Sequence, residues 1–161
     1  MAPGPRVTAV LTGVGIAAVT VGVAAAGSAA GDFDSRWYRR LRKPGWQPGG
    51  ATIGMVWTVL YTLTGASGYI LARGPRRRRA LLGGLFVLQY ALNAAFTPLL
   101  TRRRDLTLAT ADSAALLATV SALTVAAWPV RRSAAVLLLP YVTWTAFATY
   151  LSAALVRLNR R

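Results

Sequence analysis

The apolar positions of this chain fall into long runs with at most one charge each, and short basic connectors separate the runs. Each run can supply the ~20 residues that cross a ~30 Å hydrocarbon core at ~1.5 Å per residue of helix. Because lipid offers no hydrogen-bond partner to backbone N–H and C=O groups, a spanning run is expected to be helical. The pattern predicts helices over residues 7–30, 52–72, 80–100, 106–128 and 133–157. The expected fold class is an all-α membrane protein, a five-transmembrane-helix bundle in which residues 1–161 form one domain.

The first of these runs also has a second interpretation. Arg6, the apolar stretch after it and the small residues at 24–29 resemble a cleavable signal peptide. The run is long for the apolar region of a signal peptide, which favours a retained helix. Further predicted spans remain under either interpretation, so the membrane assignment does not depend on this choice.

The overall composition agrees with a membrane protein. Hydrophobic residues make up 55% of the chain and charged residues 14%, whereas about a quarter of a typical soluble domain is charged. The net charge of +15 raises the question of a nucleic-acid partner. The arginines, however, stand between apolar runs and form no face on a polar domain, so phospholipid headgroups are the better counter-charge. We therefore expect the lipid bilayer as a partner and no nucleic acid.

The basic connectors also predict a topology. Eleven lysines and arginines lie on the side that holds the connector between the first two spans (residues 31–51, the first connector), and eight lie on the other side. The positive-inside rule makes the richer side cytoplasmic. We expect an integral multi-pass protein of a bacterial inner (cytoplasmic) membrane, with its N-terminus outside and its C-terminus in the cytoplasm.

Two missing residue types restrict the chemistry of the chain. The sequence has no cysteine and no histidine. It therefore lacks disulfides, thiolate nucleophiles, the usual zinc and haem ligands and the usual general base. We expect no metal site and no bound cofactor, and any reaction would depend on aromatic, amide, hydroxyl and arginine side chains and on four acids.

Several polar and aromatic residues fall inside the predicted spans. Gln89 and Asn93 are four residues apart and share one helix face. A cavity with Trp57 and Trp144 as walls and Asn93 as a polar point would suit a flat, largely apolar ligand. As an alternative, the two amides only bond a neighbouring helix and the tryptophans only fill the bundle. For Asp112, a structural acid is favoured over a proton relay.

The first connector and the helix after it carry a more particular pattern. Residues 37–61 read WY-x4-KP-x-W-x-P and then VWT-x2-Y, although interface anchoring requires only aromatics and cations. With later pieces of the chain, this pattern resembles the TspO/MBR family of tryptophan-rich sensory proteins. The matching pieces, in order, are Trp37-Tyr38, Lys43-Pro44, Trp46, Pro48, Val56-Trp57-Thr58, Tyr61, Gly65, Gln89, Ala91-Leu92-Asn93, Asp112, Pro140-Tyr141, Trp144 and Ala148.

The resemblance implies a five-helix bundle, commonly a homodimer, in which the first connector folds like a lid over one end of an internal pocket. Ligands of the family include protoporphyrin IX and other porphyrins, sterols or other lipids, and synthetic drug-like molecules. By position, Trp57, Asn93 and Trp144 match pocket residues, and residues 37–48 match the lid. The ligand-binding candidates are Trp37, Tyr38, Trp46, Trp57, Tyr61, Asn93, Phe96, Tyr141, Trp144 and Ala148.

Three hypotheses of function follow from the resemblance. The first is a regulatory, sensory or transport protein that binds a tetrapyrrole by stacking on indoles, with arginines pairing the propionates. The second is an oxygen- or light-dependent enzyme that degrades protoporphyrin IX, with Trp57 and Trp144 as its catalytic residues. The third is a lipid or metabolite transporter or a scaffold. Ser152 and Ala153 stand where animal members carry Asn-Tyr, so the sterol motif of those members is absent.

Overall fold

The computed structural model describes residues 14–15, 18, 22, 33 and 35–160. A short helix, α2 (Arg36–Arg40), lies within the first connector. Four long helices follow, α3 (Gly50–Ala72), α4 (Arg76–Thr101), α5 (Leu106–Ala127) and α6 (Arg132–Asn159), and the described residues contain no strand. All four are long and apolar enough to cross a membrane, which confirms four of the predicted spans. The remaining predicted span, residues 7–30, lies almost wholly outside the described residues.

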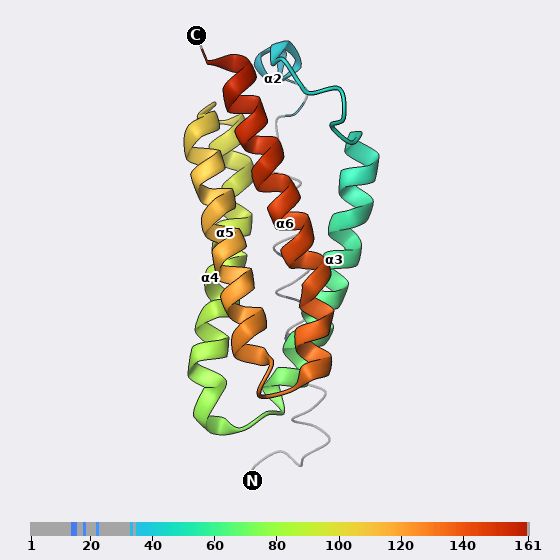
Figure 1. Ribbon diagram of the computed structural model, residues 1–161, viewed down its shortest axis with the longest axis vertical. Coiled ribbons are helices and arrows are strands. Elements are labelled where there is room, and N and C mark those ends of the chain that lie inside the picture. The colour runs from blue at the N-terminus through green and yellow to red at the C-terminus, as the bar shows by residue number, and fades with distance from the viewer. Residues whose placement is uncertain (1–13, 16–17, 19–21, 23–32, 34, 161) are drawn as a thin grey trace.

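The four long helices run up and down as an elongated bundle, with α2 beside the end of α6 (Figure 1). Helix α5 packs against both α4 and α6, whereas α3 packs mainly against α6 and touches α4 only locally. Ala127, Ala134 and Ala135 are fully buried where α5 turns into α6. Such small side chains let two helix backbones approach closely, which is how helices associate when lipid supplies no hydrophobic driving force.

The core divides into two clusters along the bundle. One lies toward the α5–α6 turn and includes Leu71, Leu82 and Leu123. The other is made of Leu60, Leu116, Val120 and Tyr141, and both Trp57 and Trp144 pack against it. Helices α3, α5 and α6 all contribute to this second cluster, so residues far apart in the sequence meet there. The candidate site lies against this second cluster.

Helix α4 begins a few residues before the apolar run that predicts it. The sequence places its start at residue 80, because counting uncharged residues stops at the arginines, but α4 begins at Arg76. Arginine is a good helix former, and its charged head can remain in the headgroup region while its stem continues the helix. The chain turns into the helix at Pro75, the residue before its first turn. Helix α4 therefore extends beyond the apolar run at its start.

Candidate ligand-binding site

A chain of hydrogen bonds joins three helices inside the bundle. The Tyr61 hydroxyl of α3 donates to Asn93 Oδ1 of α4 over 2.6 Å, and Asn93 Nδ2 donates to the Tyr141 hydroxyl of α6 over 2.9 Å. The Tyr141 hydroxyl in turn donates to Gln89 Oε1 over 3.0 Å. Gln89, Asn93 and Tyr141 are buried. The two amides therefore do bond neighbouring helices, and in doing so they fix Asn93 between two tyrosines.

Trp57 lies against this network on α3. Its ring centroid is 5.5 Å from that of Tyr61 and 5.9 Å from that of Tyr141, where the interplanar angle is 80°. The edge-to-face geometry places the positive edge of one ring on the negative face of the other. Trp57 is only half-buried. One part of the indole is thus held by the tyrosines, and another part remains accessible.

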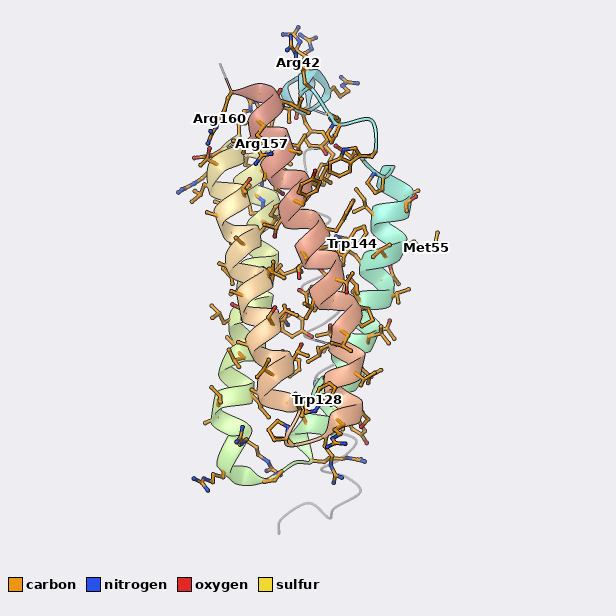
Figure 2. The ribbon with its side chains drawn as sticks, in the orientation of Figure 1. Arg42, Met55, Trp128, Trp144, Arg157 and Arg160 are labelled. Carbon is orange, nitrogen blue, oxygen red and sulfur yellow. The ribbon has the colours of Figure 1, made fainter. Side chains whose placement is uncertain are left out.

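Trp144 of α6 packs against the same core cluster. Figure 2 shows it about halfway along the bundle, on the side of α6 that faces α3. Its ring centroid is 5.2 Å from that of Phe147, one turn along the helix. The side chain is half-buried, and the indole Nε1 atom is buried without a hydrogen-bond partner. Trp57 and Trp144 are therefore placed around one hydrophobic cluster by two different helices.

The first connector is attached to the far end of α6. The Arg42 N–H donates to Asn159 Oδ1 over 3.0 Å, and Asn159 Nδ2 donates to the Arg42 carbonyl over 3.0 Å. Trp46 stacks on Tyr150, with centroids 5.3 Å apart, and meets Phe147 edge-on at 5.8 Å. These contacts hold the middle of the connector on α6 before the chain enters α3.

Helix α2 supplies two further aromatic residues of the connector, Trp37 and Tyr38. Ser35 caps it, since the Tyr38 N–H donates to Ser35 Oγ over 3.3 Å. Lys43 Nζ lies 4.0 Å from the Tyr38 ring centroid, a cation–π geometry. Burial raises the pKa of the Tyr38 phenol, and a side-chain hydrogen bond with Gln47 acts in the opposite direction. The phenol therefore stays neutral and able to donate at physiological pH.

The predicted site residues separate into three groups. Tyr61, Asn93, Tyr141 and Trp57 form one contiguous group through hydrogen bonds and ring contacts. Trp37, Tyr38 and Trp46 lie in the first connector, with Trp46 packed on α6. Trp144, Ala148 and Phe96 are half-buried, and no hydrogen bond or ring contact joins them to the first group.

The structure also adds residues that the candidate set lacks. Gln89 belongs to the hydrogen-bonded network, and Phe147 and Tyr150 receive Trp46. Tyr150 and Phe147 are three residues apart on one helix face, a spacing that could have drawn attention to them. Asn159 had no such signal, because its partner is 117 positions away. Asp112 is buried on α5, and no hydrogen bond connects it to the network.

Comparison with known proteins gives consistent matches. The sequence matches the model of the TspO/MBR family over residues 13–158. It is 37% identical over 127 residues to the tryptophan-rich protein TspO of Bacillus cereus, which covers 79% of this chain and 83% of that protein. It is 35% identical over 150 residues to the uncharacterized membrane protein YtaB of Bacillus subtilis, covering 91% and 97%. The human translocator protein is 36% identical over 120 residues, covering 73% and 71%.

Proposed function

The chain belongs to the TspO/MBR family and is an integral multi-pass membrane protein, and from this premise we propose that it binds a tetrapyrrole such as protoporphyrin IX, or a similar flat apolar molecule, in an intramembrane pocket. The ligand would lie beside Trp57, Asn93 and Trp144. Its binding would serve a regulatory, sensory or transport role. The names of the bacterial and human relatives, tryptophan-rich protein and translocator protein, are in line with such a role.

One observation carries this proposal: Trp57 is held by Tyr61 and Tyr141, which are themselves tied to Asn93. Consecutive hydrogen bonds join Tyr61, Asn93 and Tyr141, so each of these side chains fixes the orientation of the next. An indole supported in this way loses little conformational freedom when a flat ligand stacks on it. The network therefore supplies a preorganised aromatic wall with amide and phenol groups beside it.

The first connector is proposed as the lid of this pocket. Its attachment to α6 through Asn159 and Trp46 supports this role, since the connector crosses from the end of α6 to the start of α3. Exposed basic side chains on the connector, Arg39, Arg40, Arg42 and Lys43, are the groups that would pair with propionates. Arginine suits this task because its planar fork matches a carboxylate.

The cellular setting is part of the same proposal. We propose a bacterial cytoplasmic membrane, with the first connector and the end of α6 on the cytoplasmic side. The uneven distribution of lysine and arginine supports this orientation, and the bacterial relatives support the membrane. A homodimer is proposed on the family resemblance. The family match does not favour the degrading enzyme or the scaffold over ligand binding.

Titration of the purified protein with protoporphyrin IX, coproporphyrin and haem, followed by tryptophan fluorescence, tests the proposal. We expect saturable quenching by at least one porphyrin. Trp57→Ala should weaken binding about tenfold, because it removes a stacking wall worth ~1–2 kcal/mol. Trp128→Ala is the matched control, since Trp128 is exposed at the opposite end of the bundle from the connector (Figure 2). Absence of saturable quenching by all three compounds would refute the proposal.

A further inference from the structure

A groove runs along the outside of the bundle between α3 and α6. Its volume is about 610 Å³, and Met55 and Val59 of α3 and Pro140, Trp144 and Phe147 of α6 are among the residues that line it. Met55 is 69% exposed and Val59 is 53% exposed. The one hydroxyl in its lining belongs to Thr143 and donates to the Leu139 carbonyl within α6. Among the described residues, the groove therefore presents an apolar surface between α3 and α6.

One end of the groove lies beneath the first connector. Phe147 lines the groove and receives the edge of Trp46, while Arg42 is fixed to Asn159 beyond it. From there the connector passes to Gly50, where α3 begins. It thus crosses from one wall of the groove to the other. A molecule that fills the groove would meet the connector at this end.

This end of the molecule carries a concentration of exposed positive charge. The labelled side chains of Arg42, Arg157 and Arg160 gather there in Figure 2. The two described carboxylates are otherwise engaged or distant: Asp105 caps α5 by accepting from the Leu108 N–H, and Asp112 is buried. No ion pair joins either of them to these cations. The exposed cations at this end include Arg39, Arg40, Arg42, Lys43, Arg157 and Arg160.

The distance from the start of α3 to the far end of the groove corresponds to the thickness of one leaflet of the hydrocarbon core. Met55 and Leu60 lie five and ten residues after the start of α3, which at ~1.5 Å per residue is ~8 and ~15 Å along the helix. One leaflet contributes ~15 Å of the ~30 Å hydrocarbon core. A single acyl chain whose headgroup stands at the level of the connector therefore reaches the far end of the groove.

We propose that the groove between α3 and α6 binds an acyl chain of an anionic glycerophospholipid, whose phosphate is held by the basic residues of the first connector. The apolar lining selects the chain, and the exposed cations at its end, which pair with neither of the two described carboxylates, select a negative headgroup over a zwitterionic one. The groove shares Trp144 with the proposed tetrapyrrole pocket, and the cations at its end include those proposed to pair with propionates, but lipid binding in the groove does not require that a porphyrin binds. Because Trp144 lines the groove, the bound chain contacts this indole.

Native mass spectrometry of the purified chain in detergent tests the site, with phosphatidylglycerol and phosphatidylcholine added separately. We expect one tightly retained molecule of phosphatidylglycerol. Retention of phosphatidylcholine should be at least about fivefold weaker, because a single well-placed cation favours an anionic headgroup by about that ratio. Neutralising the connector with Arg39→Gln, Arg40→Gln, Arg42→Gln and Lys43→Gln together should abolish the preference. The control is Arg102→Gln with Arg103→Gln, which removes exposed charge at the same end of the bundle, in the α4–α5 turn.

A bulky side chain in the groove tests whether the groove holds the acyl chain. Val59→Trp should prevent retention of both lipids, whereas Val125→Trp, at a 73% exposed position on α5, should not. Phosphatidylglycerol with brominated acyl chains provides a second measurement on the unmodified chain. It should quench tryptophan fluorescence more strongly than brominated phosphatidylcholine, and Trp144→Phe should remove most of that difference.

Three results would overturn the proposal. The first is equal retention of the two lipids by the unmodified chain. The second is a loss of preference in the Arg102/Arg103 control as large as in the connector variant. The third is a dimer that Val59→Trp dissociates, since a second copy of the chain would then cover the groove. Porphyrin titration enters none of these measurements, so the lipid site and the proposed function can fail independently.

Discussion

Asn159, near the end of α6, hydrogen-bonds both backbone groups of Arg42, which precedes it by 117 positions. Its Nδ2 atom also donates to the Leu155 carbonyl over 2.9 Å, so the side chain is oriented by its own helix. One amide therefore reproduces the paired hydrogen bonds that a neighbouring strand would give to an extended residue. The first connector is held at a defined height on α6 by this contact.

Replacing Asn159 should release the connector without unfolding the bundle. Asn159→Leu removes both bonds to Arg42, and at ~0.5–1.5 kcal/mol per net hydrogen bond we expect a small loss of stability. Hydrogen exchange of the amides at residues 41–47 should become faster. Asn159→Asp is the matched variant, because it keeps the acceptor for the Arg42 N–H and loses only the donor. Unchanged exchange in Asn159→Leu would show that other contacts hold the connector.

Tyr141→Phe should be costly although it removes a single atom. The Tyr141 hydroxyl accepts from Asn93 and donates to Gln89, and all three side chains are buried. Leaving two buried polar groups without a partner should destabilise the protein by ~1–3 kcal/mol. Thermal unfolding in detergent measures the effect. Tyr150→Phe is the control, since Tyr150 is 62% exposed, and an equal loss in both variants would contradict the importance of the network.

Trp46→Ala tests whether the connector acts as a lid. Trp46 keeps contact with α6 through Tyr150 and Phe147, and aromatic pairs of this kind contribute ~0.5–1.5 kcal/mol each. We expect dissociation of a bound porphyrin to accelerate about three- to tenfold, because a loosened connector closes less often. Stopped-flow fluorescence measures this rate. If the association constant falls while the dissociation rate stays the same, Trp46 affects the pocket by another route.

Ala134→Leu should destabilise the bundle by overpacking. Ala134 is fully buried, and its carbonyl accepts a 2.9 Å hydrogen bond from Ser67 Oγ of α3. Extra carbon atoms would separate α6 from its neighbours, at a typical cost of ~1–3 kcal/mol. Ala122→Leu is the matched control, because Ala122 is exposed on α5. Equal melting temperatures for the two variants would mean that the contact at Ala134 is loose.

The sequence predicts the described spans well because long apolar runs with at most one charge coincide with the candidate spanning helices Gly50–Ala72 and Leu106–Ala127. The helix and the apolar run differ at the start of α4, where Arg76 and the arginines after it are helical although they lie before the apolar run. An arginine can extend a helix into the headgroup region, so charge marks the edge of the hydrocarbon core and not the end of the helix.

For the candidate site, the sequence predicts which residues share a helix face, but it does not predict which residues they contact on other helices. The spacing of Gln89 and Asn93 puts them on one face of α4, and both do bond the same tyrosine. That this tyrosine is Tyr141 depends on the height at which α6 packs beside α4, which no local pattern encodes. The contact between Arg42 and Asn159 is less predictable still, because both are polar residues near the membrane surface, where many partners are available.

The attachment of the first connector to Asn159 also sets the order in which the protein can be completed during synthesis. Arg42 leaves the ribosome early, whereas its partner is made only after α3, α4, α5 and nearly all of α6. Long-range contacts form after local ones, and chains fold from the N-terminus as they are made. The connector therefore lacks its contact with Asn159 while the four long helices are inserted. Docking of the connector on α6 is therefore the last step of assembly, and a chain arrested before α6 would lack this contact.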